Sequence, residues 1–93
     1  MNITKIEKEV IPTLTFTKED VLLKEEDVTV RKLSLARALT LGNGQKRKVK
    51  IYFELEKGEK NSVETTIWAV GEDFVTLKAG ALIPVHAISE IEF

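Results

Sequence analysis

The stretch KVKIYFELE, residues 48–56, decides the fold. Val49, Ile51, Phe53 and Leu55 are apolar, and the residues between them are mostly polar or charged. Because successive side chains of a β-strand point to opposite faces, this alternation indicates a strand with one face in a core and the other at the surface. The secondary structure of the segments on either side of this strand is predicted from their turn residues and from the spacing of their own apolar residues.

Towards the C-terminus, runs rich in β-branched and aromatic residues alternate with turn residues. The predicted strands are residues 63–70, 74–77, 81–85 and 90–93. Pro84 indicates a strand end or a sheet edge, and residues 86–89 fit a single 3₁₀ turn. Five short strands joined by tight turns predict that residues 46–93 form a barrel of the SH3/Sm-like kind.

In the N-terminal half, two interpretations stay open for Arg31 to Leu41. This segment contains good helix formers and is followed by Gly42-Asn43-Gly44, a natural helix stop, so we favour a helix. Its apolar residues also alternate, which would suit a strand with the Gly-Asn-Gly segment as its hairpin turn. We further expect a short helix capped by Thr17 and an edge strand at Val10 to Thr15.

The predicted fold class is therefore mainly β with an N-terminal α part, a five-stranded barrel preceded by one or two short helices. The 93 residues suffice for a single domain, divided into an N-terminal segment, 1–45, and the barrel, 46–93. There is no cysteine, which excludes a disulfide framework and a thiolate metal site.

The formal net charge of −1 conceals a segregation of charge along the chain. Residues 28–53 contain no acidic residue and seven basic ones: Arg31, Lys32, Arg37, Lys46, Arg47, Lys48 and Lys50. A band of this kind would attract phosphates. Alternatively, it pairs on folding with the acidic segments before and after it.

No apolar run approaches the roughly 20 residues that span a bilayer. The N-terminal residues, MNITKIEKE, are interrupted by charges before an apolar signal core can form. We therefore expect a cytoplasmic protein with no membrane partner.

Tyr52 and Trp68 are out of phase with the apolar residues of their predicted strands, so they should point outward with Lys48 and Lys50. Aromatic rings among lysines on a sheet face hold single-stranded nucleic acid by stacking and phosphate contact. The alternative is that both rings anchor residues 1–45 on the barrel.

The C-terminal half resembles the Hfq family of bacterial Sm-like RNA chaperones. Residues 49–52 (VKIY) resemble the first barrel strand of that family, 74–77 (FVTL) its third strand, and 86–89 (HAIS) the turn into its last strand. The resemblance implies a ring of barrels that binds RNA. A strand VETTIW, residues 63–68, is also similar to small bacterial proteins of unassigned function.

The resemblance transfers to individual residues only in part. Phe74 matches the aromatic residue on which the family stacks a base, and His86 matches its histidine at the uridine-binding face. Val85 stands where the family has lysine, Pro84 where it has tyrosine, and Asp73 where it has a neutral amide. These differences leave the implied fold in place but replace residues of the implied uridine pocket.

No catalytic or metal-ligating constellation is present, because His86 is the sole histidine and no acidic residues flank it at ligand spacing. We expect a non-catalytic binding module without cofactor or metal, with single-stranded RNA as its first candidate ligand. The candidate contacts are Lys46, Arg47, Lys48, Lys50, Tyr52 and Trp68, with Phe74 and His86 from the resemblance. The alternative is a protein-interaction or structural module whose barrel edge pairs with a partner protein or with another copy.

Overall fold

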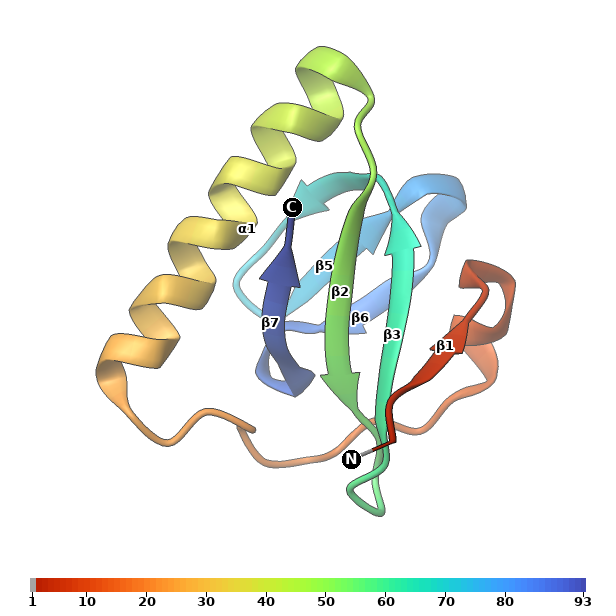
Figure 1. The fold of residues 1–93 in the computed structure, drawn as a ribbon, viewed down its shortest axis with the longest axis vertical. Coiled ribbons are helices and arrows are strands. Elements are labelled where there is room, and N and C mark those ends of the chain that lie inside the picture. The colour runs from red at the N-terminus through yellow and green to blue at the C-terminus, as the bar shows by residue number, and fades with distance from the viewer. Residues whose placement is uncertain (1) are drawn as a thin grey trace.

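The computed structural model describes residues 2–93 and shows one long helix and seven short strands in that part of the chain (Figure 1). In chain order the elements are β1 (Thr4–Ile6), the 3₁₀ helix η1 (Lys8–Thr13), α1 (Glu25–Gln45), β2 (Val49–Glu54), β3 (Lys60–Thr65), β4 (Ile67–Val70), β5 (Phe74–Leu77), η2 (Lys78–Gly80), β6 (Leu82–Pro84), η3 (Val85–Ala87) and β7 (Ile88–Glu92). The fold is mixed α/β.

The strands form two sheets. The first has four strands in the order β1-β3-β2-β7, and the second has three in the order β4-β5-β6. Thr66 lies between β3 and β4, where the chain passes from the first sheet to the second. No hydrogen-bonded ladder joins the two sheets among the described strands, and α1 packs against one strand of each, β4 and β7 (Figure 1).

The alternation predicted for β2 is confirmed. Val49, Ile51 and Phe53 are buried, and the residues between them are half-buried on the opposite face. Burial of an apolar side chain of this size stabilises a fold by about 1.5–3 kcal/mol, so these three residues are central to the stability of the core. Phe53 also packs at an angle against Phe16, with the two ring centroids 5.5 Å apart.

Helix α1 confirms the helix favoured for residues 31–41 but extends beyond it at both ends. Its first turn contains three acidic residues, Glu25, Glu26 and Asp27, which stabilise the positive end of the helix dipole. The prediction that Gly42-Asn43-Gly44 stops the helix was wrong. A Cβ atom on Gly42 would lie 2.3 Å from the carbonyl oxygen of Ile67, so this glycine allows α1 to approach β4 closely.

Two other predictions for the N-terminal half were also wrong, and β1 was not predicted. Residues 10–15 do not form an edge strand, because most of them belong to η1. The helix expected after Thr17 is absent: residues 18–24 are irregular, and α1 begins only at Glu25. The residues just before them lie beside the end of β2. The Thr17 amide donates to the carbonyl oxygen of Glu54 at 3.2 Å, and the Glu56 amide donates to that of Thr15 at 2.9 Å.

The structure has six strands after Lys46 where the sequence predicted five, because the predicted strand 63–70 divides at Thr66 into β3 and β4. The backbone carbonyl of Thr66 accepts a hydrogen bond from the Lys78 amide at 2.9 Å, and its hydroxyl donates to the Lys46 carbonyl at 3.5 Å. Thr66 belongs to neither ladder, because the pairing of β3 with β2 ends at Thr65 and that of β4 with β5 begins at Ile67. Pro84 ends β6 as predicted, and the turn η3 begins one residue earlier than expected.

Candidate functional site

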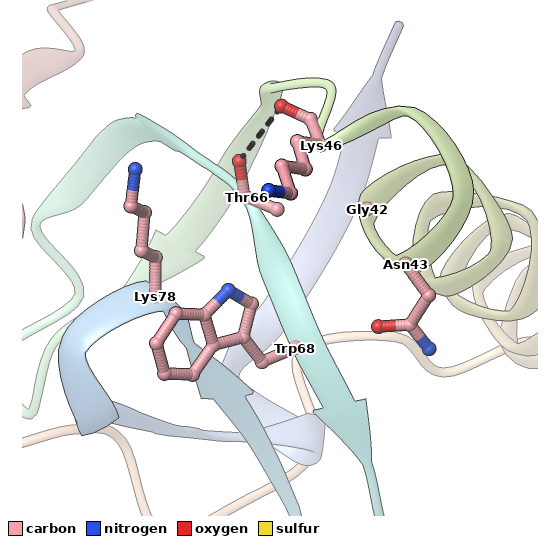
Figure 2. A pocket seen from close by; sticks show the side chains of 6 residues that line it. All are labelled: Gly42, Asn43, Lys46, Thr66, Trp68 and Lys78. Carbon is pink, nitrogen blue, oxygen red and sulfur yellow. Dashed lines mark hydrogen bonds between the residues drawn. The ribbon is translucent and has the colours of Figure 1, made fainter.

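A hollow of about 500 Å³ lies where the C-terminal end of α1 meets the beginning of β4 (Figure 2). We call it the Trp68 hollow, and it is lined by Gly42, Asn43, Lys46, Thr66, Trp68 and Lys78. The structure thus brings together two of the predicted site residues, Lys46 and Trp68, with a lysine that the sequence did not single out.

Backbone contacts hold the two lysines of this hollow in place. Lys46 follows the last residue of α1 in the left-handed conformation, with φ of 53°, and its amide donates to the Gly42 carbonyl at 3.1 Å. Lys78 begins η2, and its amide bonds to Thr66, the same residue whose hydroxyl bonds to Lys46. The end of α1, the junction between the sheets and the end of β5 are therefore fixed relative to one another.

Trp68 lies at a shift in strand register. The pairing of β4 with β5 changes between Ile67 and Ala69, so the residue between them has no regular partner on β5. Ile67 points into the core and is fully buried, whereas the Trp68 residue is 50% exposed. The C-terminal end of α1 forms one wall of the hollow, and residues 2–45 leave half of the Trp68 residue open to solvent (Figure 2).

The Trp68 hollow is electropositive. No acidic residue lines it, and neither Lys46 nor Lys78 forms an ion pair within residues 2–93. Arg47 and Lys48 follow Lys46 directly and are exposed. Two lysines thus line the hollow beside a half-exposed indole ring, which suits a ligand with a flat apolar part and negative charge.

Lys50 and Tyr52 lie elsewhere, on the outer face of the four-stranded sheet. Lys50 is paired across the sheet with Glu64 of β3 and with Glu92 of β7. The Tyr52 hydroxyl donates to the Glu92 carboxylate, and this hydrogen bond raises the pKa of the phenol above its ordinary value. The structure does not place these two residues with Trp68, and their surroundings are acidic.

Phe74 is 49% exposed at the beginning of β5, opposite Pro84 of β6. It belongs to the same three-stranded sheet as Trp68. The β4–β5 pairing runs antiparallel, with Ile67 opposite Leu77 and Val70 opposite Val75, so Phe74 and Trp68 lie towards opposite ends of the β4–β5 hairpin. Phe74 does not line the Trp68 hollow.

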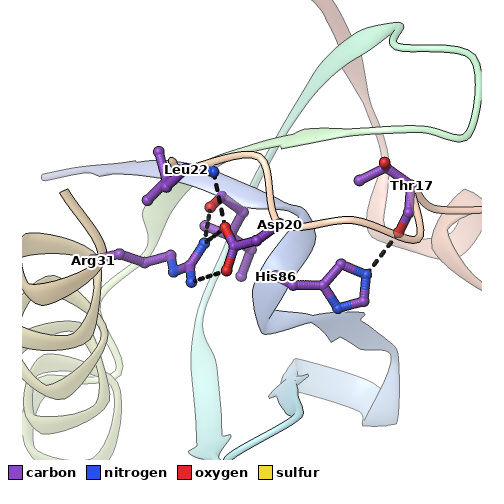
Figure 3. Close-up of polar contacts among 6 residues, drawn as sticks. Thr17, Asp20, Leu22, Arg31 and His86 are labelled. Carbon is purple, nitrogen blue, oxygen red and sulfur yellow. Dashed lines mark hydrogen bonds and ion pairs between the residues drawn. The ribbon is translucent and has the colours of Figure 1, made fainter. Parts of the chain in front are cut away.

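His86 lies in η3 and is half-buried beneath the segment that leads into α1 (Figure 3). Its Nε2 atom is 2.7 Å from the carbonyl oxygen of Thr17, and its own carbonyl accepts a hydrogen bond from the Val21 amide at 3.0 Å. Both contacts hold this segment against η3. The ring nitrogen that faces Thr17 is therefore not available to a base.

Next to His86, Asp20 and Arg31 form an ion pair with two parallel hydrogen bonds (Figure 3). Arg31 Nη1 lies 2.9 Å from Asp20 Oδ1, and Nη2 lies 2.8 Å from Oδ2. Nη1 also donates to the Ile88 carbonyl at 3.0 Å. The hydrogen bonds from Arg31 hold the pKa of the Asp20 carboxyl below its ordinary value. One cation of the basic stretch is therefore buried and structural.

Among residues 2–93, no helix has both the length and the apolar character needed to cross a bilayer, and no three potential ligand side chains gather as a metal site would require. Lys78, Asn43 and Thr66 line the Trp68 hollow but were not among the predicted site residues. Lys78 stands in a predicted tight turn, but its position beside Trp68 depends on the break at Thr66, for which the sequence gives no signal.

Comparison of the sequence with protein-family models, with curated proteins and with solved structures found no match.

Proposed function

We propose that this protein is a non-catalytic binding module for single-stranded nucleic acid, with RNA as the first ligand to test. The observation that carries the proposal is a half-exposed Trp68 between two lysines, Lys46 and Lys78, in a hollow without acidic lining. A base would stack on the indole ring, and the neighbouring phosphates would contact the lysines. Stacking of one base on an aromatic side chain contributes about 1–3 kcal/mol and tolerates any sequence.

The strand arrangement supports an Sm-like barrel as the scaffold for this module. The chain continues from β3 to β4 through one residue, Thr66, and so takes part in both sheets. A 3₁₀ turn, η3, leads into the last strand, and that strand pairs with β2. One helix precedes these strands and packs across both sheets. Small barrels of this kind are frequent nucleic-acid scaffolds, although fold alone does not assign function.

Titration of the protein with short single-stranded RNA tests the proposal, because Trp68 is the sole tryptophan and its fluorescence reports on the hollow. We expect quenching on binding and an affinity that falls linearly with salt on logarithmic axes, with a slope of about −0.7 for each phosphate contact.

The variant Lys46→Gln/Lys78→Gln should weaken binding and make the salt dependence shallower by about 1.4. Lys57→Gln, on the turn between β2 and β3, is the matched control and should leave both unchanged. An unchanged Trp68 signal with every RNA, or equal effects of the two sets of variants, would refute the proposal.

A protein-interaction module is the second candidate. β6 is an edge strand of the second sheet, and Leu82 on it is 47% exposed. An exposed edge with apolar side chains can accept an added strand from a partner protein or from another copy. Sedimentation at several protein concentrations, with and without RNA, separates the candidates: self-association that ignores RNA supports the edge, and a monomer that binds RNA supports the Trp68 hollow.

A further inference from the structure

A second hollow, of about 560 Å³, lies along the same contact between α1 and the second sheet. Most of its wall is apolar and comes from Val28, Leu35, Val70 and Val85. Two exposed residues of opposite charge also line it, Lys32 on α1 and Glu72 in the turn between β4 and β5. It therefore differs in character from the Trp68 hollow, which has lysines and no carboxylate.

Both hollows lie along one seam between α1 and β4, which we call the α1–β4 seam. The residues that border this seam from α1 are Val28, Lys32, Leu35 and Gly42, at steps of four, three and seven as expected for one helix face, and Lys46 follows just after the helix. The first three line the second hollow, and the last two line the Trp68 hollow. On β4, Trp68 borders one hollow and Val70 the other. A chain bound at Trp68 can thus reach the second hollow by following the seam.

Arg31 borders the second hollow but does not offer a free charge to a ligand. Its two terminal nitrogens are occupied by Asp20 and by the carbonyl oxygen of Ile88. A phosphate at this hollow would find Lys32 instead, while the apolar walls suit the faces of a planar ring. Glu72 is then the one side chain of the lining that accepts hydrogen bonds without donating any.

A carboxylate beside a bound base discriminates between bases. Adenine, cytosine and guanine carry an exocyclic amino group that donates to a carboxylate oxygen. Uracil carries no amino group, and its single ring N–H is flanked by two carbonyl oxygens that repel a carboxylate. The charge of Glu72 would therefore favour the amino-bearing bases over uracil.

We propose that the second hollow takes an unstacked base that bears an exocyclic amino group, on the same strand whose neighbouring base stacks on Trp68. Glu72 accepts the hydrogen bond from the amino group, and Lys32 contacts the phosphate. This inference rests on the proposed function, because it assumes that the strand enters at the Trp68 hollow.

The experiment compares homopolymers of adenylate, cytidylate and uridylate of equal length, binding the full chain at one salt concentration. The wild-type protein should bind the first two about fivefold more tightly than the uridylate polymer. Glu72→Gln should reduce this ratio to near one, because an amide donates to uracil carbonyls as well as accepting from amino groups. Glu59→Gln, an exposed residue in the turn between β2 and β3, is the matched control and should keep the ratio.

A second variant tests the hollow rather than the charge. Val28→Phe fills it from an exposed position on α1 and should also abolish the base preference, with the Trp68 quenching retained and the thermal midpoint unchanged. If all polymers bind equally and quench Trp68, or if Glu72→Gln leaves the ratio intact, this inference fails while the proposed function stands. If no polymer binds, both fail.

Discussion

Two parts of the surface bring lysines together with an aromatic ring, and only one of them has no acidic residue in its lining. At the Trp68 hollow, Lys46 and Lys78 have no acidic neighbour in the lining. On the outer face of β2, Lys50 and Tyr52 lie between strands that present Glu64 and Glu92. The difference comes from cross-strand pairing, which adds carboxylates that lie far away in the sequence. Local charge is therefore a poor guide to surface potential in a sheet.

The largest effect should come from a substitution at Gly42, where α1 approaches β4 beside the Trp68 hollow. Gly42→Ala places a methyl group 2.3 Å from the Ile67 carbonyl, so α1 must move away from β4. We expect a loss of about 3 kcal/mol in the free energy of unfolding, measured by chemical denaturation. The outer face of β2 has no part in this contact.

Gly44→Ala is the matched control for this change, because a Cβ there meets no atom within 4 Å. It should stabilise the protein by about 0.5–1 kcal/mol, through the higher helix propensity of alanine. Equal effects of the two variants would contradict the close packing of α1 on β4.

Removing each aromatic ring in turn tests which of the two parts of the surface binds RNA. Trp68→Ala should weaken binding of a labelled single-stranded RNA by about 1–3 kcal/mol, because one stacking platform is lost. Tyr52→Ala should change the affinity by less than twofold, since its surroundings repel phosphates. Fluorescence anisotropy measures the RNA affinity of both variants. A larger loss of affinity for Tyr52→Ala than for Trp68→Ala would show that RNA binds the outer face of β2, which contradicts the proposed site.

Arg31, one of the basic residues in the stretch 28–53, is paired with Asp20 and is therefore not free to bind a ligand. Asp20→Asn should destabilise the protein by about 1–2 kcal/mol at neutral pH, because it leaves a buried guanidinium without its counter-charge. RNA affinity should be unchanged, which separates this cation from those at the Trp68 hollow.

The same pair gives a pH dependence with a defined sign. The folded-state pKa of Asp20 lies below its ordinary value of 3.8, so its contribution is fully present above about pH 4 and is lost as the pH falls through the folded-state pKa. Thermal midpoints of the wild type and of Asp20→Asn should therefore converge below pH 4. A constant difference down to the most acidic condition would contradict the pair.

The smallest expected effect concerns the acidic face itself. Tyr52 is the sole tyrosine, so its ionisation can be followed by ultraviolet absorbance. Glu92→Gln should lower the pKa of Tyr52 towards its ordinary value of 10.0, because the carboxylate that raises it is gone. Glu26→Gln, on α1, is the control and should leave the titration curve in place. No shift with Glu92→Gln would mean that the pair does not exist in solution.

The features that could be predicted from the sequence are those with a local signal. The period-two alternation of Val49, Ile51 and Phe53 identified β2, and good helix formers identified the centre of α1. The extension of α1 through Gly42 could not be foreseen, because the reason for the glycine is the backbone of β4, a distant segment. The break at Thr66 likewise lies where two distant residues, Lys46 and Lys78, bond to the chain.

At the candidate site too, the features with a local signal could be predicted and those set by distant segments could not. Trp68 was correctly expected to point outward, since it is out of phase with buried Ile67, but whether residues 1–45 would cover it stayed open in the sequence. Its association with Lys46 was expected only as part of a single face that also held Lys50 and Tyr52, and the structure divides this set between two sheets. Lys78 could not be assigned, because it reaches the hollow only through the junction between those sheets.

The most direct test of the central claim is a nuclear magnetic resonance titration of the isotope-labelled protein with single-stranded RNA. The protein has one indole N–H signal, from Trp68, which identifies the hollow without further assignment. Our account predicts that this signal shifts together with the backbone amides of Lys46, Thr66 and Lys78, and that the amides of Lys50 and Tyr52 remain in place. Shifts confined to the outer face of β2, or an indole signal that does not move, would contradict it.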